Sequence, residues 1–357
     1  ETIRVATFNT ALSRNEAGAF VQEMRLGGSD QAAAVAEIIQ RVRPDILLLN
    51  EIDHDPQGNA ADLFARYLLT GQGGAAGIDF PHRFTAPVNT GVLAPVDLDG
   101  DGRRALPGDG YGWGRYPGHY GMAVLSRFPI AATRTFRMLR WQAMPGNLIP
   151  PGHYSAEAEA VLRLSSKSHW DVTAETPQGP LHLLASHPTP PVFDGAEDAN
   201  GRRNADEIRF WAAYLAGADW ITDDRGVAGG LGDGHFVLLG DLNADPEGGD
   251  GRRAVIGALL AHPRLQDARP ASDGAASAPH RPATFTGDPT LATSGWGPPA
   301  GPLRVDYVLP DSRLTVTGAG VFWPAAGDPL RRLVGESGET VSSDHRLVWV
   351  DIAFPGP

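Results

Sequence analysis

The sequence contains no cysteine and no long hydrophobic run. The absence of cysteine excludes a disulfide framework, a thiolate metal site and a cysteine nucleophile. A membrane-spanning helix needs about 18 consecutive apolar residues, whereas the longest strongly apolar run here is Ile46–Leu49. The 357 residues are 42% hydrophobic and 20% charged, which is ordinary for a globular enzyme with a packed core. The composition therefore excludes a membrane-embedded protein.

Positive charge is also scarce. Lysine is rare, no segment is rich in Lys and Arg, and the formal net charge is −12. A protein that holds duplex DNA through its phosphates is expected to be basic on at least one face. The acidity argues against a processive nucleic-acid binder and leaves room for a local basic groove only.

Hydrophobic periodicity predicts an α/β fold. Residues 3–9 alternate as a strand does, residues 30–42 have apolar side chains at helical spacing with Asp30 as the N-cap, and residues 45–51 form a strand buried on both faces. Further strands are expected at 121–126, 170–175, 181–186, 236–239, 304–309, 314–322 and 347–352, and further helices at 204–215 and 253–261. We expect an α/β protein with its site at the carboxyl ends of strands.

No change in composition marks a linker. We therefore expect one domain over 1–357, built from two packed halves of about 1–176 and 177–357. Long loop insertions are expected at about 87–119, 144–156 and 268–302, where Gly, Pro and Asp are frequent.

Oxygen- and imidazole-bearing side chains follow several of the predicted strands. Asn9 and Glu51 end the first two, Asp241 and Asn243 follow a later one, and Asp344 with His345 precedes the last. Each alone has the alternative of a turn former or helix cap. Together they are the ligand types that bind hard divalent cations such as Mg²⁺, Mn²⁺ or Ca²⁺.

These motifs resemble those of the endonuclease/exonuclease/phosphatase superfamily, the deoxyribonuclease-like metal-dependent phosphoesterases. The resemblance runs from Val5 to Val350, and the strings around Lys167, His187 and Arg203 look like a bacterial branch of it. The matching motifs are Thr7–Asn9, Leu49–Glu51, Tyr120–Ser126, Ser186–His187, Gly240–Asn243, Arg304–Tyr307 and Ser343–His345.

The resemblance implies a four-layer α/β sandwich, with two mixed, mainly antiparallel sheets face to face and helices outside. It also implies metal-dependent phosphoester hydrolysis. Asn9, Glu51 and Asp344 would face the metal, and Asp241 with Asn243 would orient the water or the phosphate oxygens. His187 would bind phosphate or act as an acid, and His345 would be the catalytic histidine oriented by Asp306. Whether Asp241 or His345 takes the proton from water stays open.

The loop Asp97–Gly102 has the D-x-D-x-D-G pattern of calcium loops. The glutamate expected at the twelfth position of an EF-hand is Gly108, followed by Asp109. Two alternatives fit, a structural Ca²⁺ held by Asp97, Asp99 and Asp101, and a solvated acidic turn. A weak Ca²⁺ site, the lack of cysteine and a first residue that is not methionine favour an extracytoplasmic (secreted or periplasmic) location.

Several other residues leave alternatives open. Arg203 and Asn204 could contact a substrate phosphate or cap the helix that follows. Lys167 and His169 are expected to be structural hydrogen bonders. The aromatic residues of 111–120 could stack on a ring of the substrate or pack on one another.

We expect a metal-dependent phosphatase or phosphodiesterase that acts on a small or lipid-like phosphate ester. We also expect the protein to have no membrane span and to be a monomer. A secreted nuclease of the same chemistry is the first alternative, so nucleic acid remains a possible but not favoured substrate. A non-catalytic binding module is the second alternative, and the complete set of site residues argues against it.

Overall fold

The computed structural model describes residues 1–336 and 338–356. Its strands form two sheets, one of six strands in the order β10-β11-β1-β2-β4-β3 and one of five in the order β5-β6-β7-β8-β9. The strands are β1 (Ile3–Leu12), β2 (Ile46–Ile52), β3 (His82–Phe84), β4 (Met122–Ser126), β5 (Ile130–Thr135), β6 (His169–Thr176), β7 (Gly179–Ser186), β8 (His235–Asp241), β9 (Asp306–Pro310), β10 (Thr315–Val321) and β11 (Val348–Ala353).

Each sheet is antiparallel except for one parallel pair. β1 and β2 run parallel, and so do β7 and β8. A parallel pair needs a crossover connection, commonly a helix. The two crossovers contain α2 (Asp30–Val42) and α5 (Ala199–Leu215). The carboxyl ends of four strands are thereby brought to one edge of the molecule.

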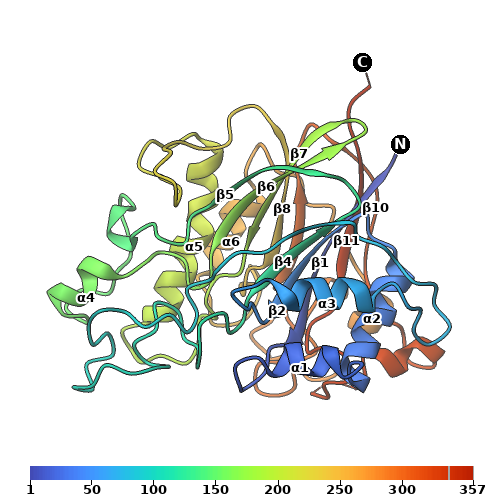
Figure 1. Cartoon of the computed structure of the whole chain (residues 1–357), viewed down its shortest axis with the longest axis horizontal. Coiled ribbons are helices and arrows are strands. Elements are labelled where there is room, and N and C mark those ends of the chain that lie inside the picture. Colours follow the sequence, from blue (N-terminus) through green and yellow to red (C-terminus); the bar gives the residue numbers. More distant parts are fainter. Residues whose placement is uncertain (337, 357) are drawn as a thin grey trace.

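The sheets pack face to face, and their inner faces form the main core. The β7 strand shows how this follows from its alternation, because Leu183 belongs to the core cluster that also contains Val5 and Leu48 of the first sheet. Its neighbour Leu184 points the other way and packs with Trp211 of α5 in a second cluster. Two sheets with a helical layer on each outer face confirm the predicted four-layer α/β sandwich (Figure 1).

Helices lie on both outer sides of the sandwich, α1, α2 and α3 on one side and α5 and α6 on the other (Figure 1). Ser29, not Asp30, is the N-cap of α2, because its side chain accepts the amide of Ala32. The remaining helices are α1 (Ala19–Arg25), α3 (Asn59–Tyr67), α4 (Ala156–Val161), α6 (Arg253–Leu260) and α7 (Asp273–Ala276), with short 3-10 turns η1 (Trp141–Ala143), η2 (Pro289–Leu291) and η3 (Pro329–Leu333).

The sheets do not divide the chain near residue 176. β5 and β6 lie before that point and belong to the second sheet, whereas β10 and β11 lie at the end of the chain and return to the first. The predicted loop 268–302 contains α7 and η2. Within the described residues, no helix is long and apolar enough to cross a membrane.

Candidate active site

Asp241 lies at the centre of a buried polar cluster that draws on both sheets. Its Oδ2 accepts a hydrogen bond from Asn9 Nδ2 at 2.9 Å and lies 3.3 Å from His187 Nε2 and 3.6 Å from His345 Nε2. Its Oδ1 accepts the amide of Asn243 at 3.0 Å. The charge of His345 and the hydrogen bonds from His187 and Asn9 lower the pKa of Asp241 in spite of its burial. The carboxylate is therefore ionised and held by donors on every side.

His345 and Asp306 form a buried pair behind Asp241. His345 Nδ1 lies 2.8 Å from Asp306 Oδ2, which also accepts the hydroxyl of Thr293 at 2.7 Å. Burial disfavours the imidazolium, but the charges of Asp306, Asp241 and Asp344 raise the pKa of His345 well above its usual value. The Asp306 contact leaves Nε2 as the ring nitrogen that faces Asp241, as predicted for an orienting carboxylate.

Glu51 and Asp344 form a second acidic pair beside Asp241. Among the described residues the Glu51 carboxylate has no hydrogen-bond partner, and burial together with the charges of Asp344 and Asp241 raises its pKa to about 7. Asp344 Oδ2 accepts the indole N–H of Trp296 at 3.0 Å. Like charges gathered without a bonded protein cation fit a hard divalent cation.

A second acidic combination could also supply metal ligands. Asp241, Asp306 and His345 each bring one ligand atom to within 4.8 Å of the others. However, His345 Nδ1 is already hydrogen-bonded to Asp306, and a metal on that nitrogen would displace this contact. Glu51 and Asp344 therefore fit the metal better, and the pair His345–Asp306 fits an orienting role.

The chain matches one family of known proteins in sequence. A model of the Endonuclease/Exonuclease/phosphatase family matches residues 6–345. The chain belongs to this family. Its members are hydrolases that act on phosphoesters, so this chain is placed among phosphoester hydrolases. No curated protein matches the sequence.

Solved structures of the family share the fold at low sequence identity. An endonuclease/exonuclease/phosphatase from Beutenbergia cavernae is 22% identical with a TM-score of 0.55, over 99% of this chain and 72% of that one. A family protein from Leptotrichia buccalis is 15% identical with a TM-score of 0.51, over 99% and 100%. The catalytic domain of human Nocturnin is 16% identical with a TM-score of 0.51, over 99% and 94%.

Asn9 and Asn243 hold Asp241 in place. Asn9 Oδ1 accepts the amide of Ala11, and its nitrogen is committed to Asp241, so Asn9 contacts the aspartate directly while its metal-facing role stays a prediction. Asn243 Nδ2 donates to the carbonyl of Pro188, next to His187. Ala11, Glu51, Asn243 and Tyr120 all have positive φ. Such strained backbone concentrates at functional sites.

The chain's only lysine, Lys167, was expected to be a structural hydrogen bonder and is placed differently. It is buried, and its pKa is lowered by burial against the opposing charges of Glu207, Glu51 and Asp241. Lys167 therefore belongs to the site. Its being the single lysine of the sequence was the signal that could have singled it out. His169 is structural as predicted, since its ring contacts Ser165 Oγ and the carbonyl of Glu207.

Arg203 and Asn204 are engaged with the backbone rather than with the site. Arg203 donates to the carbonyls of residues 111, 163, 164 and 165, and Asn204 donates to those of Thr189 and Leu242. Neither caps the helix, because α5 begins earlier, at Ala199. Their contacts join loops to α5, and the substrate role stays a prediction.

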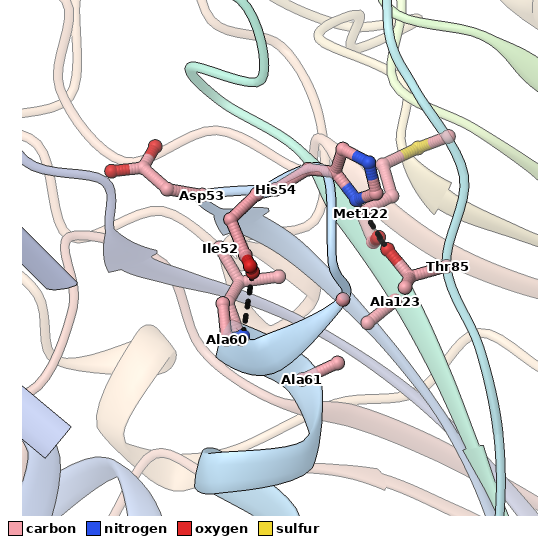
Figure 2. A pocket seen from close by; sticks show the side chains of 10 residues that line it. Ile52, Asp53, His54, Ala60, Ala61, Thr85, Met122 and Ala123 are labelled. Atoms are coloured by element: carbon pink, nitrogen blue, oxygen red, sulfur yellow. Dashed lines mark hydrogen bonds between the residues drawn. The ribbon is translucent and has the colours of Figure 1, made fainter. Parts of the chain in front are cut away.

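The aromatic loop at 111–120 lies against the end of β2, directly after Glu51. Tyr120 donates its amide to Asp53, and His54 donates its amide to the carbonyl of Gly118. Asp53 and His54 point to opposite sides of the chain, and His54 lines a narrow pocket where it contacts Thr85 (Figure 2). The rings of Tyr116, His119 and Tyr120 stack on one another. Self-packing thus accounts for these three rings.

The acidic loop 97–109 forms a compact turn. Asp97 accepts the amides of Gly100 and Gly102, and the buried Asp109 accepts those of Leu98, Asp99 and Ala105. Asp97, Asp99, Asp101 and Asp109 bring ligand atoms to within 4.8 Å of one another. The fourth carboxylate comes from Asp109, one residue beyond the position at which an EF-hand has its glutamate.

Proposed function

We propose that this protein hydrolyses a phosphoester bond in a small or lipid-like phosphate ester with the help of a divalent cation, Mg²⁺, Mn²⁺ or Ca²⁺. The observation that carries the proposal is the Asp241 carboxylate, which two imidazoles and an amide contact at the meeting point of both sheets. Hydrolysis requires an oriented water, a positively charged environment for the phosphoryl oxygens and help for the leaving oxygen.

Glu51 and Asp344 would hold the cation, with Asn9 as the neighbouring amide. When bound, the cation would neutralise charge on the phosphoryl group and on the leaving oxygen. The unpaired Glu51 carboxylate supports this assignment, because its repulsion from Asp344 is relieved when a cation lies between them.

The chain's own groups would orient the water and the phosphate. Asp241 accepts a hydrogen bond from the attacking water and orients it, while Asn243 and Asn9 fix the carboxylate by their contacts with it. His345, charged and held by Asp306, donates from Nε2 to a phosphoryl oxygen. His187 donates from Nε2 on the other side of Asp241. Water then attacks phosphorus in line with the leaving oxygen, the bond between phosphorus and that oxygen breaks, and the proton that the water loses ends on the leaving oxygen.

We also propose a structural Ca²⁺ in the loop 97–109. Four carboxylates with mutual ligand distances within 4.8 Å support it, because such a group repels itself at neutral pH unless a cation is bound. This site is separate from the hydrolytic one and would stabilise the insertion.

Hydrolysis of bis-p-nitrophenyl phosphate beside p-nitrophenyl phosphate tests the proposal. Both are assayed after chelation and after adding back Mg²⁺, Mn²⁺ or Ca²⁺, with His345→Ala as the matched blank. We expect metal-restored turnover that the variant lacks. Turnover of the diester would assign a phosphodiesterase, and turnover of the monoester a phosphatase. Turnover that survives chelation, or that His345→Ala retains in full, would contradict the proposal.

A further inference from the structure

Lys167 is a buried cation whose charged group has no partner among the residues that the structure describes. It lies two residues before β6 and is 6% exposed. Its ammonium forms no hydrogen bond and no ion pair with any residue that the structure describes, although the charges of Glu207, Glu51 and Asp241 act on it. Lys167 is the single lysine among the 30 Lys and Arg residues of the sequence.

A largely buried ammonium with no hydrogen bond to the protein is costly, because it loses part of its hydration without gaining a partner. A flexible backbone does not explain its position, since hydrogen bonds fix the backbone at residues 166 and 167. The carbonyl of Lys167 accepts the amide of Asn89 at 2.9 Å, and the preceding Ser166 donates its amide to Glu207 at 2.6 Å. Ser166 also donates its hydroxyl to the carbonyl of His187 at 3.3 Å, which holds this segment beside the site. The three donors of Lys167 make no bond to a described residue.

The charges around this ammonium indicate what it would bind. Glu51 and Asp241 belong to the hydrolytic site, and both act on Lys167 from beyond ion-pair distance. A site that holds these carboxylates together with Asp344 repels an anionic substrate. A compact ammonium with three rotatable donors suits a single oxygen in a closed space, whereas a guanidinium fork would need a wider one.

We propose that Lys167 binds a non-bridging oxygen of the substrate's phosphoryl group. This inference rests on the proposed hydrolytic function and adds an anchoring cation to it. Lys167 donates to the oxygen that faces away from His345, so that the phosphoryl group lies between two cationic side chains while Asp241 orients the water. A purely structural role, in which Lys167 neutralises Glu207, is the alternative.

The single lysine permits a direct test of binding in the intact protein. Trinitrobenzenesulfonate labels neutral amines, and Lys167 is the single lysine of this sequence. With Mg²⁺ present, inorganic phosphate at ten times its Kd should slow labelling of Lys167 about tenfold, measured by mass spectrometry of peptides. Labelling of the N-terminal amine, the internal control, should not change. Unchanged labelling of Lys167 at saturating phosphate would overturn the proposal.

Variants separate anchoring from charge neutralisation. Lys167→Met should weaken the calorimetric affinity for inorganic phosphate by about 10- to 100-fold and raise KM for the hydrolysed ester similarly, and Lys167→Arg should restore part of both. In Glu207→Gln/Lys167→Met the phosphate affinity should stay low. Recovery of wild-type affinity in this double variant would establish the structural role instead. Because labelling and calorimetry need no turnover, absence of hydrolysis would contradict the proposed function and leave the Lys167 result intact.

Discussion

Replacing Asp306 by asparagine is the sharpest probe of the His345–Asp306 pair. Asparagine keeps the size of the side chain and an acceptor for the Thr293 hydroxyl, which lies 2.7 Å from Asp306 Oδ2. The substitution removes the negative charge 2.8 Å from His345 Nδ1. A hydrogen bond between charged groups contributes about 1.5–3 kcal/mol. We therefore expect kcat to fall by about 10- to 100-fold.

The assay is metal-restored hydrolysis of bis-p-nitrophenyl phosphate, with thermal unfolding as a check of folding. Asp171→Asn is the matched control, because Asp171 holds His182 Nδ1 at 2.7 Å in a pair remote from Asp241. That variant should keep its kcat. Since Asp306 acts through His345, Asp306→Asn/His345→Ala should be no slower than His345→Ala alone. Multiplicative losses in the double variant, or a kcat of Asp306→Asn equal to that of the wild type, would refute the coupling.

Four further predictions concern the metal, the acidic loop, a buried histidine and Arg203. Mn²⁺ at 100 times its Kd should stabilise the protein by about 2.7 kcal/mol in thermal unfolding, and Glu51→Gln should abolish that increment. Ca²⁺ should raise the Tm of the wild type more than that of Asp101→Asn, and equal shifts would refute the loop site. Burial lowers the pKa of His169 to about 4. As the pH falls from about 6.5 to 4, His169 therefore binds a proton in the unfolded chain and not in the folded one, and the free energy of unfolding drops by about 3 kcal/mol. His169→Asn should flatten that urea-unfolding profile. Arg203→Ala should lower the free energy of unfolding by about 3 kcal/mol and leave KM unchanged, and a raised KM would restore the substrate role.

The sequence predicted the strands that carry the site, because buried strands produce apolar runs and alternation that can be seen without a structure. Asp241 follows such a run, and its position at the end of β8 is confirmed. The pairing of His345 with Asp306 was also expected, and the 2.8 Å contact confirms it. The position of Asp241 depends on a local strand end, whereas the second contact joins residues 39 apart in the sequence and was expected from the motifs that carry the family resemblance.

Residues whose role depends on helix boundaries or on distant loops could not be placed. Arg203 was expected near the start of a helix, but α5 begins at Ala199, which moves Arg203 into its second turn and onto backbone carbonyls. Lys167 lies in a polar segment that resembles the start of many strands. The charges that act on it come from Glu207 and Asp241, which are far away in the sequence. Such environments depend on packing between elements, and local periodicity does not encode them.

The return of β11 to the first sheet has a consequence for the order in which this protein folds during synthesis. β1 precedes both β2 and β11 in the sequence and pairs with both, so one of its hydrogen-bonding edges stays open until β11 has been synthesised. An open edge is a template for aggregation. The residues just before β11 include Asp344 and His345, so closing that edge also delivers the last side chains of the site. Nascent chains should therefore need protection from aggregation until the same late step that makes them hydrolytically competent.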